Sequence, residues 1–209
     1  MSKKTRAMKI ISELESLYPK AASALNYQNP LQCMIATILS AQCTDAQVNK
    51  ITPQLFRKYP DAEAFANATL PELENDIRST GFFRNKAKAI RQSCQSVMKD
   101  HAGFVPDTIE KLLTLTGIGR KTANCVIGNA YGKPAVMVDT HVKRLVYRMG
   151  LSAQKNPDKI EMELKRLLPE SLWTKASHLL IHHGRQVCSA RKPKCEECSV
   201  NQLCLKKGI

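Results

Sequence analysis

Lys121 stands at a position that is unfavourable for a positive charge, shortly after the closely spaced Gly117 and Gly119. Residues 113–124 read LTLTGIGRKTAN, and the apolar spacing that follows predicts a helix beginning after Gly119. The N-terminus of a helix repels cations, and Arg120 adds a second positive charge beside the lysine. Both effects favour the neutral amine, which is a nucleophile able to form a Schiff base. An ordinary surface lysine that contacts phosphate is the alternative.

The Gly117-x-Gly119 pair joins two segments with helical spacing through a short turn. Glycine loses more backbone freedom on folding than any other residue, so two of them need a reason. A bare backbone lets the main chain approach a ligand closely, and the free N–H groups at the start of the next helix suit a phosphate. A plain helix–helix turn with a glycine cap would have the same sequence. The hairpin alone therefore favours neither a phosphate grip nor a plain turn over the other.

Asp139 is the single carboxylate in the apolar run AVMVDTHV, and Thr140 and His141 follow it directly. A carboxylate there could face a cleft and take part in charge stabilisation. It could also cap the helix that begins next, because Asp is a preferred N-cap residue. The two roles are compatible, since a cap can hold a carboxylate at the protein surface.

Four of the eight cysteines crowd into the last part of the chain with the spacing C-x6-C-x2-C-x5-C: Cys188, Cys195, Cys198 and Cys204. In a reducing compartment this cluster indicates a metal site rather than disulfides. Four thiolates suit either zinc or a [4Fe–4S] cluster, and the spacing leaves both open. The loop after the first cysteine carries three cations, Arg191, Lys192 and Lys194, which could grip a phosphate. The other cysteines, Cys33, Cys43, Cys94 and Cys125, are expected to be small core residues.

The whole chain of 209 residues carries a formal net charge of +14, from 32 Lys and Arg against 18 Asp and Glu. Such a surface attracts polyanions, of which nucleic acid is the commonest. No apolar run approaches the ~20 residues that span a bilayer, and the basic N-terminus lacks the features of a signal peptide. We therefore expect a cytoplasmic protein that binds nucleic acid.

Apolar residues recur at spacings of three and four almost throughout, so the pattern predicts roughly ten helices and few or no strands. The segment 131–139 interrupts this pattern with Gly132 and Pro134 and is the best candidate for a domain seam. Helix start signals recur along the chain, at Asn29, Thr44, Asp61, Thr69, Asp107 and Asn156.

The motifs LSAQCTD, LTGIGRKTAN and VDTHVKR, with the cysteine spacing, resemble endonuclease III in their order and separations. That family comprises bacterial DNA glycosylases and abasic-site lyases of the helix-hairpin-helix superfamily, and the resemblance covers essentially the whole chain. It implies an all-α fold in which two helical domains flank a DNA cleft. A six-helix barrel domain would occupy residues 23–133, with the helix-hairpin-helix at about 107–131. A discontinuous iron–sulfur domain would join 1–22 to 134–209, with a cluster loop at 188–204.

The resemblance also implies roles for individual residues. Lys121 matches the family's nucleophile and Asp139 its catalytic carboxylate. Gln42 matches the residue that enters the duplex where the damaged nucleotide has left, and Phe82 stands where the family has an apolar wedge, usually Leu. The cofactor would be one [4Fe–4S] cluster per chain, held by Cys188, Cys195, Cys198 and Cys204. The remaining residues expected to contact DNA are Gly117, Gly119, Arg120, His141, Arg191, Lys192 and Lys194.

The implied activity is base excision repair of oxidised or ring-saturated pyrimidines in duplex DNA. A Schiff base on Lys121 would be followed by strand cleavage 3′ to the abasic site through β-elimination. The partner would be double-stranded DNA with damaged bases or abasic sites, bound by a monomer associated with the nucleoid. The alternatives are a mismatch glycosylase of the same fold, a non-catalytic DNA-binding module and an electron-transfer protein of ferredoxin type.

Overall fold

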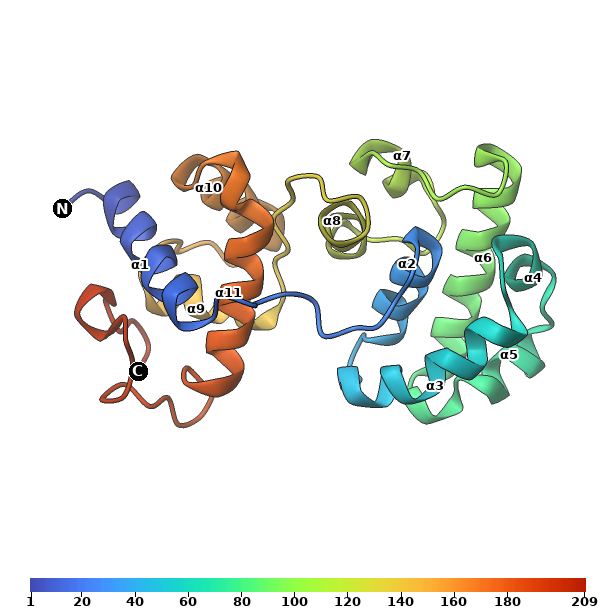
Figure 1. Ribbon diagram of the computed structural model, residues 1–209, viewed down its shortest axis with the longest axis horizontal. Coiled ribbons are helices and arrows are strands. Elements are labelled where there is room, and N and C mark those ends of the chain that lie inside the picture. Colours follow the sequence, from blue (N-terminus) through green and yellow to red (C-terminus); the bar gives the residue numbers. More distant parts are fainter. The chain divides into compact units, whose positions relative to one another are not determined.

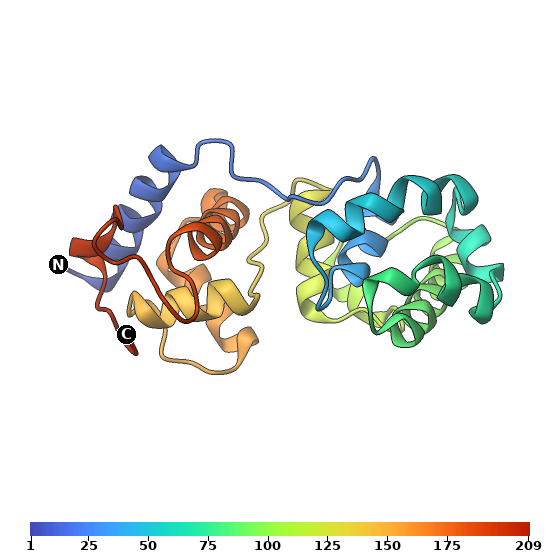
Figure 2. The same ribbon diagram turned by 90° about the horizontal axis from the view of Figure 1, so that it is seen from below.

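All regular elements of the chain are helices, as the apolar spacing predicted, and no strand is present. The computed structural model describes residues 1–209, which divide into two compact units. The central unit is Ala24–Gly132, and the terminal unit combines Met1–Ser23 with Lys133–Ile209. Both chain termini therefore lie in the terminal unit (Figure 1 and Figure 2).

The central unit is built on α6, which packs against α2, α4 and α5, while α8 packs against α2 and α7. Its long central helix provides a scaffold for the shorter helices (Figure 1). The helices are α2 (Pro30–Leu39), α3 (Asp45–Lys58), α4 (Ala62–Asn67), α5 (Leu70–Asp76), α6 (Phe83–His101), α7 (Ile109–Thr114) and α8 (Arg120–Asn129), with a 3-10 turn η1 (Arg78–Thr80) before α6.

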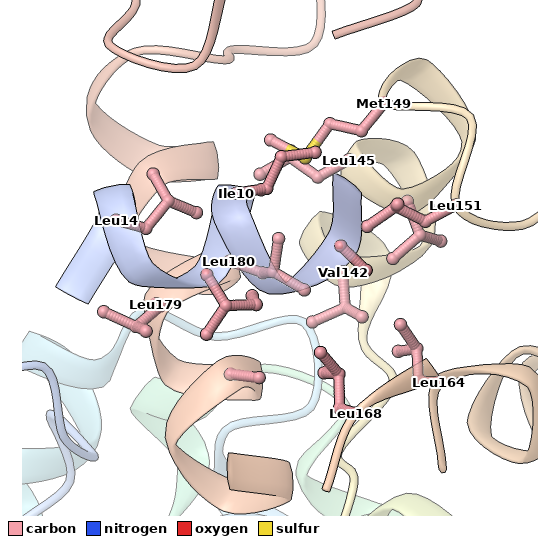
Figure 3. Packing of buried hydrophobic residues seen from close by; sticks show 14 of the residues in the cluster. Ile10, Leu14, Val142, Leu145, Met149, Leu151, Leu164, Leu168, Leu179 and Leu180 are labelled. Carbon is pink, nitrogen blue, oxygen red and sulfur yellow. The ribbon is translucent and has the colours of Figure 1, made fainter. Parts of the chain in front are cut away.

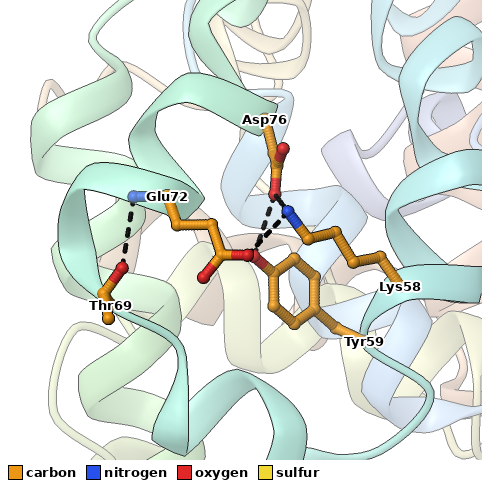
Figure 4. A network of polar contacts seen from close by, with 5 residues as sticks. All are labelled: Lys58, Tyr59, Thr69, Glu72 and Asp76. Atoms are coloured by element: carbon orange, nitrogen blue, oxygen red, sulfur yellow. Dashed lines mark hydrogen bonds and ion pairs between the residues drawn. The ribbon is translucent and has the colours of Figure 1, made fainter.

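Polar contacts join α3 to α5 on the outside of the central unit (Figure 4). The Lys58 ammonium lies 2.9 Å from Glu72 and 2.8 Å from Asp76, and the Tyr59 hydroxyl donates to the same Asp76 oxygen at 2.8 Å. Burial and the neighbouring Asp76 carboxylate raise the pKa of Tyr59 to about 12. The ion pairs are largely exposed, so they contribute little stability to the contact between α3 and α5.

The terminal unit forms its core from helices that are far apart in the sequence, with α11 packed against α1 and α9 (Figure 3). Ile10, Leu14, Val142, Leu145 and Leu179 are all fully buried in it. Burying each such side chain contributes roughly 1.5–3 kcal/mol. The helices are α1 (Lys3–Leu17), α9 (Thr140–Arg148), α10 (Pro157–Leu167) and α11 (Trp173–Gln186), with 3-10 turns η2 (Glu170–Leu172) and η3 (Asn201–Leu203).

Arg6 explains why the first helix belongs with the last third of the chain. Its guanidinium donates to the main-chain oxygens of Met149, Gly150 and Leu203, the last at 3.1 Å. One side chain thereby links α1 to the end of α9 and to the C-terminal cysteine segment.

Five of the six predicted helix starts are confirmed, because Asn29, Thr44, Asp61, Thr69 and Asn156 each cap a helix through a side-chain oxygen. The prediction that Asp107 caps the helix before the hairpin is wrong. Thr108 is the N-cap, since its backbone is extended and its hydroxyl accepts from the Lys111 N–H at 3.4 Å. None of the helices combines the length and the hydrophobicity that a membrane-spanning segment needs.

Candidate active site and cysteine loop

A pocket of about 350 Å³ in the central unit brings together three of the residues singled out from the sequence, Lys121, Gln42 and Phe82. They come from three separate segments: the first turn of α8, the turn after α2 and the residue before α6. Gly117 and the buried Lys86 also line the pocket. A primary amine in a pocket large enough for a sugar or a base can act as a nucleophile toward a bound ligand.

Lys121 is positioned by the hairpin between α7 and α8. Gly119 is the N-cap of α8 with an extended backbone, so Arg120 and Lys121 are the first two helical residues. The first-turn N–H groups of this helix have no side-chain cap, which leaves them open to an anion. The expected helix start after Gly119 is confirmed.

The structure gives a reason for glycine at position 117 but not at position 119. Gly117 has φ +89°, and a Cβ there would lie 3.1 Å from the Cα and Cβ of Ala89 on α6. Its positive φ and its tight packing on α6 together favour glycine at this position. Gly119 has an ordinary φ of −93°, and a Cβ added there would have no neighbour within 4 Å, so the fold itself does not require glycine at this position.

Gln42 and Phe82 both have left-handed backbone conformations, with φ +51° and φ +48°. Non-glycine residues in this region are strained and persist only where the surroundings fix them. Phe82 is 61% exposed, so its ring is accessible to a ligand. Cys43, next to Gln42, is only half-buried, so the prediction that it is a core residue is wrong. The same prediction is confirmed for the buried Cys33, Cys94 and Cys125.

Asp139 belongs to the terminal unit and caps α9, with its Oδ1 accepting from the Val142 N–H at 2.8 Å. The residue is half-buried, so part of it remains at the surface of this unit. His141 lies in the first turn of α9, and burial lowers its pKa. Asp139 acts in the opposite direction, and Arg144 adds to the lowering. The cap role and partial exposure therefore coexist, as the sequence indicated.

The four C-terminal cysteines line one pocket of the terminal unit. Burial raises the pKa of the Cys198 and Cys204 thiols, and the neighbouring cysteines raise it further. Metal ligation requires the thiolate form, and a bound cluster would supply the positive charge that offsets the repulsion among four thiolates. Two polar contacts involve the sulfurs: the Lys206 N–H donates to Cys204 Sγ at 3.4 Å, and His183 Nε2 lies 3.3 Å from Cys198 Sγ. No three His, Cys, Asp or Glu side chains converge on a position for a single metal ion.

Two arginines from α9 hold the loop that follows Cys188. The buried Arg148 donates to the main-chain oxygens of Ser189 at 2.6 Å and Ala190 at 2.8 Å, and to Cys188 Sγ at 3.4 Å. Arg144 donates to the Cys188 main-chain oxygen and lies 3.1 Å from His141 Nδ1. The position of the loop is therefore tied to the helix that Asp139 caps.

The basic side chains of this loop point outward: Arg191, Lys192 and Lys194 are all exposed or partly exposed. The Ser189 hydroxyl closes the turn, donating to the Lys192 main-chain oxygen at 2.6 Å. Lys194 lies 3.6 Å from the Glu197 carboxylate, so its charge is partly compensated. Arg191 and Lys192 have no such carboxylate beside them and are the better placed of the three to contact phosphates.

Sequence reasoning did not single out Lys86, Arg144 or Arg148. A signal for Lys86 was present, because the helical spacing of Ile90, Cys94 and Val97 places it on the buried face of α6. A lysine in an apolar register is informative, since lysine is almost never fully buried without partners.

Comparisons with known proteins agree with this geometry. Residues 35–170 match the model of the HhH-GPD superfamily of base excision DNA repair proteins, and residues 188–204 match the iron–sulfur binding domain of endonuclease III. The chain is 52% identical to endonuclease III of Synechocystis sp. over 97% of its own length and 93% of the relative. A solved trapped covalent intermediate of endonuclease III with DNA, an estranged-adenine complex, superposes with a TM-score of 0.94 at 39% identity, covering 99% of this chain and 97% of that chain. A thermostable thymine-DNA glycosylase has a TM-score of 0.87 at 25% identity, covering 96% and 95%.

Proposed function

Because the chain belongs to the HhH-GPD superfamily of base excision DNA repair proteins, in its endonuclease III family, we propose roles for its residues in a glycosylase and lyase reaction. The protein is a DNA glycosylase with abasic-site lyase activity, it binds damaged duplex DNA, and its cofactor is a [4Fe–4S] cluster. The observation that carries the residue roles is the pocket shared by Lys121, Gln42 and Phe82.

Lys121 is the nucleophile in this proposal. The lone pair of its amine attacks C1′ of the damaged nucleotide, and the base leaves with the electron pair of the glycosidic bond and takes up a proton. Ring opening gives an imine between Nζ and C1′, which acidifies the proton on C2′. Loss of that proton and cleavage of the C3′–O bond expel the 3′ phosphate. Lys121 is suited to this role because the first turn of α8 places it in the lining of the pocket.

Asp139 is the carboxylate that stabilises the positive charge developing on the sugar and assists proton transfer. Its cap bond to the Val142 N–H holds one oxygen, so the other is the one available to the substrate. Holding the carboxylate in a fixed orientation reduces the reorganisation needed during the reaction.

Gln42 and Phe82 take the place of the everted nucleotide. The exposed Phe82 ring would enter the base stack as a wedge, and the Gln42 amide would pair with the base left without a partner. The target base has to leave the stack before an amine can reach its sugar. Gly117, Gly119 and Arg120 would hold a DNA phosphate at the start of α8, and His141, Arg191, Lys192 and Lys194 would contact the backbone elsewhere.

The four cysteines at 188–204 are proposed as the cluster ligands, which their common pocket and the arginine contacts of the loop support. When bound, the cluster fixes the fold of the basic loop rather than taking part in base release. We further propose that the central unit is the six-helix barrel domain, that the terminal unit is the iron–sulfur domain and that the protein acts at the nucleoid. The lesion class is oxidised or ring-saturated pyrimidines.

Borohydride trapping on duplexes tests these roles. The wild-type protein is expected to form a covalent complex with DNA that contains an oxidised pyrimidine, and Lys121→Ala is expected to form none. Lys99→Ala, which removes an exposed lysine at the end of α6, is the matched control and should trap normally. A trapped complex of equal yield with Lys121→Ala would refute the assigned nucleophile. Duplexes with thymine opposite guanine belong in the panel, because preference for them would favour a mismatch glycosylase.

A further inference from the structure

Lys86 is a buried lysine that the reaction outlined above does not use. It lies at the start of α6, is only 4% exposed and lines the same pocket as Lys121. Its ammonium donates to two main-chain oxygens, those of Leu39 and Thr80, each at 2.8 Å. Burial lowers its pKa, so the protein keeps this group in place against a desolvation penalty.

The two acceptors stand directly before the two strained turns of the pocket. Leu39 is the last residue of α2, three residues before Gln42, and Thr80 ends η1, two residues before Phe82. Only four non-glycine residues of the chain have a positive φ, and two of them are Gln42 and Phe82. Strained conformations of this kind persist where neighbouring contacts over-determine them.

A lysine is well suited to join these turns. Its long apolar stem can lie among buried side chains, while its compact ammonium offers donors to carbonyls from different segments. The Leu39 oxygen is at the C-terminal end of α2, where the helix dipole favours a cation. The Lys86 ammonium thereby links the turns that carry Gln42 and Phe82, although these turns are about 40 residues apart in the sequence.

We propose that Lys86 is a positioning residue for base eversion, which holds Gln42 and Phe82 together at the rim of the pocket that Lys121 lines. This inference rests on the proposed function, because it gives Gln42 and Phe82 a purpose in the duplex. Lys86 acts through these two turns and makes no contact with the sugar. Its loss should therefore impair steps that require a base to leave the stack more than it impairs the chemistry of Lys121.

The experiment compares two duplexes of the same sequence, one with an oxidised pyrimidine and one with a preformed abasic site at that position. Lys86→Met keeps the apolar stem and removes the donors. Base release by this variant is expected to fall roughly tenfold to a hundredfold, because misplacement of positioning groups by about 1 Å has effects of that size. Strand cleavage at the abasic site should fall less than about threefold, because no base has to be everted there. Lys99→Met is the matched control: it lies about 20 Å further along α6 and should leave both rates unchanged.

A fluorescent adenine analogue opposite the abasic site gives a second measurement. Its emission reports whether side chains have entered the stack, and the change on binding should be smaller with Lys86→Met than with the wild type. Equal loss of both rates, or no loss of either, would overturn the inference. If Lys86→Met does not fold, as judged by circular dichroism, Lys86→Arg decides, because its larger head displaces the two carbonyls. A lowered ratio of base release to strand cleavage then supports the inference, and a wild-type ratio overturns it. A wild-type protein that releases no base would instead contradict the proposed function.

Discussion

Replacing the two hairpin glycines one at a time separates their contribution to protein stability from their contribution to DNA affinity. Gly117→Ala puts a side chain at φ +89°, which costs about 1–2 kcal/mol for an L-residue. The new Cβ also lies 3.1 Å from the Ala89 backbone, and such overpacking costs about 1–3 kcal/mol. The sum is roughly 2–5 kcal/mol. For a protein of this size that lowers the melting temperature by roughly 4–20 °C.

Gly119→Ala should leave stability nearly unchanged. The position has an ordinary φ, and nothing lies within 4 Å of the added methyl group. Ala is a poorer N-cap than Gly, but it also restricts the unfolded chain, and the two effects are each under about 1 kcal/mol and opposite in sign. The methyl group would, however, keep a DNA phosphate away from the first N–H groups of α8. We expect duplex affinity to fall about tenfold, because the loss of one hydrogen bond to a charged group weakens binding by about that factor.

Thermal unfolding followed by circular dichroism, and fluorescence anisotropy with an abasic-site duplex, measure the two effects. The expected result is a Gly117 variant that melts early and a Gly119 variant that melts normally but binds weakly. A Gly117→Ala protein that melts within about 1 °C of the wild type would refute the packing argument. A Gly119→Ala protein with unchanged affinity would refute the phosphate contact.

Three further perturbations have defined outcomes. Asp139→Ala should lower the free energy of unfolding, measured by urea denaturation, by about 1 kcal/mol because the cap on α9 is lost. Asp139→Asn keeps an acceptor and should leave that free energy unchanged, and equal stabilities of the two variants would rule out the cap. Burial holds the pKa of His178 at about 4 in the folded protein against 6.5 for the free side chain, so the unfolded chain binds the proton first and stability falls with pH from 6.5 toward 4. Between pH 7 and pH 5 the wild type should lose about 2 kcal/mol more than His178→Gln, and parallel losses in urea denaturation would contradict this. Arg148→Met removes the donors to the main-chain oxygens of Ser189 and Ala190. The rate at which a chelator removes the cluster, measured by visible absorption, should rise about tenfold. An unchanged rate would show that Arg148 does not hold the loop.

Local signals in the sequence were sufficient for the helices. Cap residues such as Thr44 and Thr69 act within three residues of the chain, so their effect can be predicted without knowing the rest of the fold. The wrong prediction of Asp107 as a cap is an error of one residue, because either Asp107 or its neighbour Thr108 could have accepted the hydrogen bond from a first-turn N–H. The places of Lys121 in the first turn of α8 and of Asp139 at the cap of α9 were likewise predictable from their neighbours in the sequence.

Contacts over long sequence separations were not predictable in this way. The sequence by itself determined the all-helical class, the positive charge, the hairpin and the cysteine spacing, because each depends on residue types within one turn or loop. Only the tertiary structure decided that Gly117 packs against Ala89, and that Lys86 joins the turns before Gln42 and Phe82. Such contacts depend on which distant segments pack together, and that choice follows from burying the apolar faces of whole helices rather than from any local pattern.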